Sequence, residues 1–206
     1  MIEVWGRQSS VNVQKVMWAA AELGVPVRRY DAGGAFGVVG TDDYAAMNPN
    51  RLVPVLRDGD LVLWESNTIV RYLASKTGNE TLWPSDIAER ALLDRWFDWA
   101  SCTLGPQLGP LFIGLVRTRA EDRNPAALER ARNQAQQRFE TLDRHLAGRR
   151  FIAGDTFTMG DIAPGAMAYR WFGLAIERPR LGNLESWYNR LTERQAYRLN
   201  VMIPII

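Results

Sequence analysis

The segment from Asn48 to Ala74 constrains the fold of this chain most, because it predicts a turn, a β-hairpin and a helix in direct succession. Pro54 has no backbone N–H and a fixed φ, so it belongs at a strand start, at a sheet edge or in a cis bond. An Asp-Gly pair, which suits the positive φ of a hairpin turn, divides two short apolar runs. We therefore expect two antiparallel strands that contain Val53, Val55, Leu61 and Leu63.

A helix is expected directly after this hairpin, from Asn67 to Lys76, with Ser66 as its N-cap. The start of a helix offers backbone N–H groups without intrahelical partners and the positive end of the helix dipole. Together with the Ser66 hydroxyl, these groups favour a carboxylate. The sequence thus predicts an anion site at Ser66.

The residues before Asn48 predict a βαβ unit. A strand over Ile2–Trp5 is followed by helical spacing from Val13 to Leu23, which Gly24 ends, and then by a strand over Val25–Tyr30. Such a crossover makes the first two strands parallel. The glycine-rich segment 31–40 lacks the spacing of a nucleotide-binding fingerprint, so we expect a mobile loop that approaches a ligand. A short helix is expected over 41–47.

The composition changes after Lys76, and a linker is predicted over residues 77–84 between a domain at 1–76 and an all-helical domain at 85–206. Thr158 and Asp161 form a capping box at the start of one of its helices. The Gly-Pro pairs at 105–106 and 109–110 are expected to kink or break the first long helix. The expected helices cover 86–104, 125–146, 159–172 and 183–193, and the apolar tail 201–206 should pack back on the protein.

The composition excludes several classes of function. The net charge of +2, from 25 basic and 23 acidic residues, is too even for a nucleic-acid-binding surface. Neither a secretory leader nor an apolar run long enough to span a membrane is recognisable. A single cysteine, Cys102, excludes a disulfide framework and fits a cytoplasmic location, and it is expected to be a packed thiol. With one histidine, His145, expected as a helix C-terminal cap, no metal site is predicted.

Taken in order, these elements resemble the glutathione S-transferase family over nearly the whole chain, in particular its bacterial serine-type, theta-like or nu-like members. The most specific segments are Asn48-Pro49 with Val53-Pro54, Glu65-Ser66, and the region from Gly154 to Asp161. The resemblance implies an α/β thioredoxin-like N-terminal domain, an all-α C-terminal domain, a homodimer and glutathione as the cosubstrate.

The resemblance also implies the glutathione-binding residues. Pro54 is similar to the family's cis-proline, and the backbone of Val53 would pair with the cysteinyl part of glutathione as an added strand. Ser66 would take the γ-glutamyl carboxylate and Glu65 the ammonium, although Ser66 as a simple N-cap is the alternative. Arg51 is the best candidate for the glycyl carboxylate, with Arg7 and Lys15 as alternatives to it.

The residue that contacts the thiol is less narrowly defined. Trp5 stands near the place of the tyrosine of tyrosine-type members and has no hydroxyl, so the resemblance implies a serine, threonine or cysteine type. Ser10 with Asn12 resembles the Ser/Thr-x-Asn arrangement of several bacterial members and is preferred, while Ser9 aligns with the serine of theta-like members. The remaining alternative is that this serine only caps the helix and takes no part in the reaction.

The sequence supports one principal function and two alternatives. The principal one is a transferase that activates the glutathione thiolate for attack on a small hydrophobic electrophile. The alternatives are glutathione-dependent reduction of disulfides or peroxides, and a non-catalytic interaction protein of the same fold. For the electrophile, an apolar wall is expected near the Gly-Pro pairs, unless these residues are ordinary core: Leu104, Leu108, Leu111, Phe112 and Leu115.

Overall fold

The computed structural model describes residues 1–206, which its contacts group into two compact units. The first unit comprises Met1–Pro84 with Gln195–Ile203, and the second comprises Ser85–Arg194 with Pro204–Ile206. The predicted linker over 77–84 ends where the first unit ends. The grouping differs from the predicted domains in two respects, since residues 77–84, expected as a linker, and residues 195–203, expected in the second domain, both group with the first unit.

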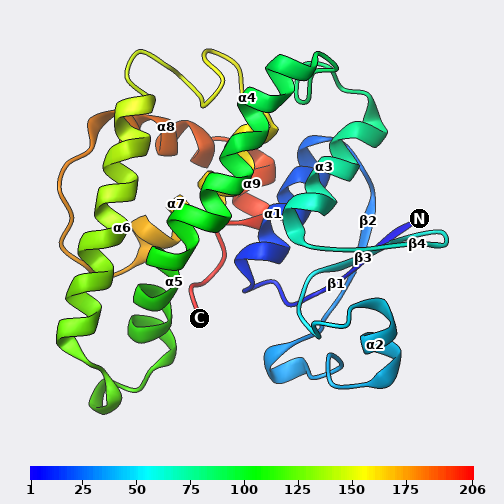
Figure 1. Ribbon diagram of the computed structural model, residues 1–206, viewed down its shortest axis with the longest axis horizontal. Coiled ribbons are helices and arrows are strands. Elements are labelled where there is room, and N and C mark those ends of the chain that lie inside the picture. The colour runs from blue at the N-terminus through cyan, green and yellow to red at the C-terminus, as the bar shows by residue number, and fades with distance from the viewer. The chain divides into compact units, whose positions relative to one another are not determined.

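A four-stranded mixed sheet in the order β2-β1-β3-β4 forms the centre of the first unit (Figure 1). The parallel pairing of β1 with β2 and the antiparallel β3–β4 hairpin confirm the predicted βαβ unit and hairpin. Gly59, at φ 60°, and Asp60 form the two-residue turn, since Asp58 pairs with Leu61. The strands are β1 Ile2–Trp5, β2 Val27–Tyr30, β3 Val55–Asp58 and β4 Leu61–Trp64.

Helices cover both faces of this sheet, with α1 (Val11–Glu22) and α3 (Ser66–Thr77) on one side and α2 (Asp42–Met47) on the other (Figure 1). The alternation of strand side chains explains both layers. Val55 packs with Tyr44 of α2, whereas its neighbour Leu56 points to the opposite face, and both Val55 and Leu56 are fully buried. The α/β fold class of the N-terminal part is therefore confirmed.

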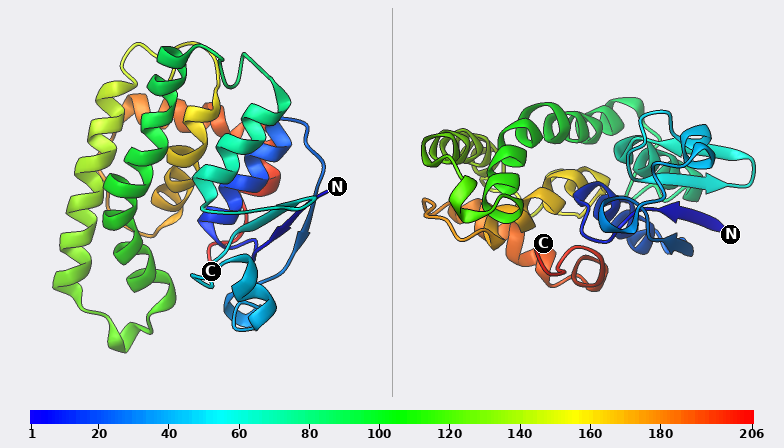
Figure 2. Two further views of the ribbon diagram at one scale, coloured as in Figure 1. Left: turned by 45° about the vertical axis from the view of Figure 1, so that its right-hand side comes forward. Right: turned by 90° about the horizontal axis from the view of Figure 1, so that it is seen from below.

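A short C-terminal helix, α9 (Gln195–Asn200), belongs to the first unit and packs on α1 (Figure 2). Tyr197 meets Trp18 edge to face with ring centroids 4.6 Å apart, and both side chains are fully buried. Six residues are too few for a periodic pattern, which explains why the sequence did not predict this helix. The predicted packing of the apolar tail holds for Val201, which is fully buried, whereas Met202 and Ile206 are exposed.

The second unit is helical, as predicted, but its Gly-Pro pairs do not break the first helical run. Instead, π-helical turns over Trp99–Leu104 and Ile113–Arg117 flank α5 and keep the run continuous. Within this run, Pro106 lies in the first turn of α5 and Pro110 lies inside the same helix. The helices are α4 (Ile87–Asp98), α5 (Gly105–Phe112), α6 (Pro125–His145), α7 (Ile162–Gly173) and α8 (Gly182–Thr192).

Asp161 is the polar centre of this unit and is fully buried. Its carboxylate accepts hydrogen bonds from the backbone N–H of Ile152 at 3.0 Å, from that of Thr158 at 3.0 Å, and from the indole N–H of Trp187 at 2.8 Å. The predicted capping box with Thr158 is present. Burial nevertheless raises the pKa of the Asp161 carboxyl to about 6, because desolvation disfavours the charged form more than these donors favour it.

Two side chains in this unit differ from their predicted environments. Cys102 is exposed, not packed, because it lies on the outer side of the first π-helical turn. His145 does lie in the last turn of α6, but its Nε2 is 2.9 Å from the Ile152 carbonyl oxygen and its ring packs against Trp96. Burial lowers the pKa of His145, so the neutral ring donates to that carbonyl.

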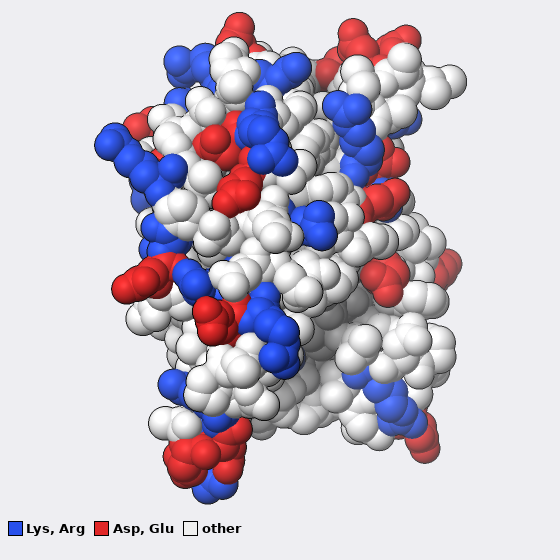
Figure 3. Space-filling view, turned by 60° about the vertical axis from the view of Figure 1, so that its left-hand side comes forward, with Lys and Arg blue, Asp and Glu red and all other residues white.

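The surface carries no segregated charge on the face drawn in Figure 3, where basic and acidic side chains alternate. None of the helices combines the length and the apolar character needed to cross a bilayer.

The raised pKa of Asp161 predicts a specific pH dependence of stability. The folded state holds the proton up to about pH 6, whereas the unfolded chain releases it near the ordinary value of 3.8. Stability is therefore highest below pH 3.8 and falls as pH rises towards 6, by about 3 kcal/mol in total. Urea unfolding between pH 4 and 7 should show this decline in the wild type and its absence in Asp161→Asn.

The exposed Asp155→Asn provides the matched control and should keep the wild-type slope. Equal slopes for the wild type and Asp161→Asn would contradict the assignment. At pH 7, Asp161→Asn should also unfold about 1–3 kcal/mol more easily, because its amide group cannot accept all of the donors that the carboxylate satisfies.

Candidate active site

The N-terminus of α1 carries the two serines that the sequence proposes for the thiol. Ser10 is the N-cap residue, with extended backbone angles, and its side chain makes no capping hydrogen bond. Its backbone N–H donates to the Arg7 carbonyl at 3.2 Å, which fixes the turn before the helix. Ser10 is 8% exposed, and Ser9 is half-buried in the same turn. The Ser10 hydroxyl is thus held at the start of α1 without serving as a cap.

The N-terminus of α3 differs from its prediction by one residue. Ser66 is the first helical residue, and Glu65 occupies the N-cap position with φ 69° and no side-chain capping bond. A positive φ is unusual for a residue with a side chain and costs of order 1 kcal/mol or more. Ser66 is buried and Glu65 is exposed. Glu65 therefore occupies a strained N-cap position, directly before the first-turn N–H groups of α3.

One hydrogen bond joins these two helix starts. The Ser66 hydroxyl donates to Asn12 Oδ1 at 3.3 Å, across the interface between α3 and α1. The predicted thiol-contacting pair Ser10 and Asn12 and the predicted carboxylate-binding pair Glu65 and Ser66 therefore lie in one place, although they are separated by more than fifty positions in the sequence.

The Val53–Pro54 bond is cis, as the resemblance implied, and lies close to the start of α1. A Cβ built on Gly6 would be 3.3 Å from the Val53 Cβ and 2.4 Å from Val13 Cγ2, so only glycine allows this approach. A Cβ on Gly33 would likewise be 3.2 Å from Val53. The backbone N–H and C=O of Val53 take no part in the ladders of the sheet.

Arg51, the predicted partner of a glycyl carboxylate, is engaged elsewhere. Its guanidinium donates to the carbonyls of Gly40 at 2.5 Å and Thr41 at 3.1 Å, and it lies 3.5 Å from the Asp42 carboxylate. In this structure Arg51 therefore holds the glycine-rich loop. It could contact a glycyl carboxylate only if these hydrogen bonds broke.

The two alternatives to Arg51 are also accounted for. Arg7 lies against the glycine-rich loop, since a Cβ on Gly33 would be 3.0 Å from its guanidinium nitrogen. Lys15 is 1% exposed and donates from Nζ to Asn67 Oδ1 at 2.9 Å. No local pattern indicates this burial, because a lysine on an amphipathic helix is usually on its solvent-facing side.

The predicted apolar wall lies in the core of the second unit. All four of its principal side chains are at most 3% exposed, so they match the ordinary-core reading and present no open surface: Leu104, Leu108, Leu111 and Phe112.

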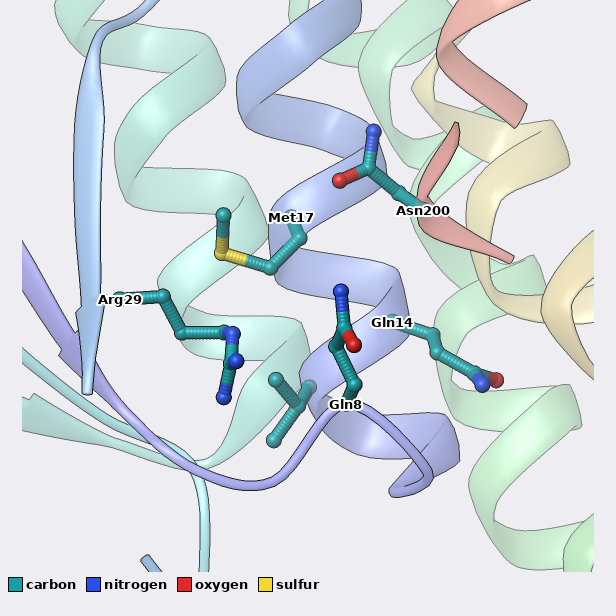
Figure 4. A pocket seen from close by; sticks show the side chains of 6 residues that line it. Gln8, Gln14, Met17, Arg29 and Asn200 are labelled. Carbon is teal, nitrogen blue, oxygen red and sulfur yellow. The ribbon is translucent and has the colours of Figure 1, made fainter. Parts of the chain in front are cut away.

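A small polar cavity of about 40 Å³ lies within the first unit, between α1, β2 and α9 (Figure 4). Figure 4 shows Met17, Gln8 and Arg29 turned towards one another, while the Gln14 amide points away from them. None of the predicted site residues lines this cavity, and its size suits a water molecule or two but not a peptide. No group of three or more acidic, histidine or cysteine side chains is arranged to hold a metal ion.

Comparisons with known proteins identify close relatives. Residues 9–76 match the family model for the glutathione S-transferase N-terminal domain, and residues 125–190 match that for the C-terminal domain. The chain is 44% identical to glutathione S-transferase GstB of Escherichia coli over the full length of both, and 31% identical to glutathione S-transferase 3 of Zea mays over 99% of this chain and 95% of that one.

A solved structure is also similar over the whole chain. It is the theta class glutathione S-transferase from the citrus canker pathogen Xanthomonas axonopodis pv. citri, with glutathione bound. The TM-score is 0.96 at 45% sequence identity, covering 100% of this chain and 99% of that one.

The close approach at Gly6 predicts that a single methyl group will disturb the site. Gly6→Ala should lower the free energy of unfolding by about 1–3 kcal/mol, because the new Cβ overlaps Val13 and pushes the start of α1 away from Val53. Gly109→Ala is the control, since nothing lies within 4 Å of its added Cβ and a helical alanine is favoured. Urea denaturation of both variants makes the comparison, and equal stability would contradict this packing.

Proposed function

The chain belongs to the glutathione S-transferase family, and from this premise we propose that it joins the thiol of glutathione to a small hydrophobic electrophile at the paired starts of α1 and α3. The observation that carries the proposal is the hydrogen bond from Ser66 to Asn12. This hydrogen bond joins the start of α3, which suits a carboxylate, to the start of α1, which suits a thiolate. Glutathione is a single tripeptide that carries both groups, so its site needs both helix starts.

The first turn of α3 binds the γ-glutamyl end in this proposal. The carboxylate accepts hydrogen bonds from first-turn N–H groups, that of Ser66 included, where the helix dipole adds to the attraction, while the single proton of the Ser66 hydroxyl stays on Asn12. The Glu65 carboxylate pairs with the adjacent ammonium. The positive φ of Glu65 supports this role, because strained backbone is commonly retained where geometry serves a ligand.

Val53 binds the cysteinyl residue through its backbone. Its N–H and C=O remain outside the sheet ladders and can pair with an extended peptide. Gly6 brings the start of α1 within van der Waals distance of Val53, so a cysteinyl side chain held there lies near Ser10. Binding thus directs the sulfur to the N-terminus of α1.

Ser10 stabilises the thiolate. A free thiol has a pKa of about 8.5 and is mostly protonated at neutral pH. The Ser10 hydroxyl, which caps no helix N–H, donates to the sulfur, and the dipole of α1 favours the same negative charge. The thiol proton leaves to solvent. The sulfur then attacks the electrophilic carbon, an S–C bond forms, and the leaving group departs with its electron pair.

Asn12 orients this arrangement through its bond to Ser66, and Ser9 is the alternative hydroxyl donor. We assign no side chain to the electrophile, because the predicted apolar wall is buried core. Arg51 reaches a glycyl carboxylate only after releasing the loop carbonyls that it now binds. We further propose a homodimer acting in the cytoplasm, where a single exposed cysteine stays reduced.

Serine substitutions test the choice of thiol partner. Ser10→Ala should raise the pKa of bound glutathione by about 1–2 units and lower kcat/KM at pH 6.5 by about 10–100-fold, since each unit corresponds to tenfold in ionisation. Ser9→Ala, the matched control, should stay within about twofold of the wild type. The measurements are thiolate absorbance at 240 nm and turnover of an aryl halide.

A loss of activity in Ser9→Ala but not in Ser10→Ala would show that Ser9 stabilises the thiolate. If both variants were inactive but the pKa of the bound thiol were unchanged in each, neither serine would have this role. A protein that reduces a small disulfide but leaves the aryl halide intact would instead be a glutathione-dependent reductase. Calorimetry without any glutathione binding would leave a non-catalytic interaction protein.

A further inference from the structure

Arg29 is a charged side chain on the core-facing side of β2. It lies opposite Val4 in the pairing of β2 with β1, and Val4 is fully buried on the face that also contains Leu56. Alternation along a half-buried strand favours an apolar side chain at such a position. The Arg29 side chain is only 20% exposed, although its guanidinium is always charged. Because such burial is costly, a specific partner should account for it.

The partner of Arg29 in the interior is the first peptide group after β1. Its Nη1 donates to the Gly6 carbonyl oxygen at 2.6 Å and to the Asp31 carboxylate at 2.5 Å. The Asp31 side chain is 41% exposed, so this ion pair adds little stability and mainly orients the guanidinium. The N–H of the same peptide group belongs to Arg7 and donates to the Ala32 carbonyl at 3.0 Å. Both polar atoms of this peptide group are therefore fixed.

The clamped peptide group is the base of the turn that carries Ser10. The Arg7 carbonyl accepts the Ser10 N–H at 3.2 Å, so this turn is built directly on the residue that Gly6 and Arg29 hold. The Ser10 side chain makes no capping hydrogen bond that would fix it in another way. The direction of its hydroxyl therefore follows the backbone before it.

Packing alone does not fix this turn. The cavity of about 40 Å³ drawn in Figure 4 borders it, and Gln8 of the turn, Val13 and Gln14 of α1 and Arg29 are among the residues that line it. Side chains that border a cavity lose dispersion contacts on that side. A polar tether therefore affects the position of the turn more here than it would in a close-packed core.

We propose that Arg29 is a positioning residue for glutathione activation, which holds the turn before α1 through the Gly6 carbonyl and so aims the Ser10 hydroxyl at the thiol. This inference rests on the proposed function and deepens it. Arg29 acts through the backbone and does not contact the ligand. Without the tether the turn samples other positions, so the hydroxyl donates less often to the sulfur and the thiolate loses part of its stabilisation.

Hydrogen exchange tests the tether in the protein without ligand. Arg29→Met removes the guanidinium, so the Arg7 and Ser10 amides should exchange about tenfold faster than in the wild type, as for a local opening. Arg29→Lys keeps a cationic donor and should stay within about threefold of the wild type. Arg28→Met is the matched control, because Arg28 is exposed and its guanidinium lies over the Tyr30 ring. It should leave both amides unchanged.

The thiol of bound glutathione reports the effect on the site. Arg29→Met should raise its pKa by about 0.5–1 unit and lower kcat at pH 6.5 by about 3–10-fold, since each unit corresponds to tenfold in ionisation. The KM for glutathione should stay within about twofold, because the tether acts on thiolate stabilisation and not on the ends of the peptide. At pH 9, where the thiol is ionised in both proteins, the difference in kcat should disappear.

A Ser10→Ala background distinguishes this role from a general loosening of the fold. If Arg29 acts through the Ser10 hydroxyl, Arg29→Met causes no further rise in the thiol pKa once that hydroxyl is absent. Arg29→Gln, whose side chain is too short to reach the Gly6 carbonyl but stays polar, carries the same expectations if Arg29→Met does not fold.

An unchanged thiol pKa in the Arg29 variants, or a rise of the same size in both backgrounds, overturns the proposal. A wild type that binds no glutathione would instead refute the proposed function. The exchange rates of the ligand-free protein separate the two failures, since they report the tether without any ligand.

Discussion

The hydrogen bond from Ser66 to Asn12 is the interaction on which the proposed site depends, because it joins two helix starts that the sequence places far apart. Each start alone is an ordinary feature, with polarised N–H groups that water or a side chain can satisfy. Joined, they form a surface with a place for a carboxylate at α3 and a place for a thiolate at α1. A tripeptide that carries both groups matches this surface better than a single anion does.

The shape of the proposed site depends on backbone features more than on side chains. Gly6 and Gly33 have no Cβ, and each allows the chain to approach Val53 more closely than another residue would. The Val53–Pro54 bond is cis and the Glu65 backbone has a positive φ. The positive φ of Glu65 costs free energy locally, and the packed sheet and helices around it supply the stability that maintains it.

The sequence predicted the elements of the first unit because their signals are local. A Pro-containing strand start, an Asp-Gly turn and apolar residues at helical spacing each act within a few positions. The capping box of Asp161 was predictable for the same reason. The helix α9 was missed because six residues give no period. The Gly-Pro pairs lie where the regular α-helix is interrupted, but they do not end the helical run, because π-helical turns, which a sequence does not reveal, continue it.

Side-chain contacts were harder to predict than helices and strands, because they depend on long-range packing. The burial of Lys15 depends on Asn67, which lies 52 positions away, and no local pattern contains that information. The contacts of the Arg51 guanidinium with the carbonyls of Val39, Gly40 and Thr41 were likewise not indicated by any local pattern. A feature that belongs to the backbone, such as the cis bond before Pro54, was easier to predict from the sequence than a feature that depends on side-chain contacts.

The central claim is that the starts of α1 and α3 act as one site, and a double-mutant cycle tests it most directly. Glutathione affinity would be measured by calorimetry for the wild type, Ser66→Ala, Asn12→Ala and the double variant. The account predicts that the two losses are not additive, with a coupling free energy of about 0.5–1.5 kcal/mol, as for a hydrogen bond between the two side chains. Losses that add within about 0.3 kcal/mol would contradict it.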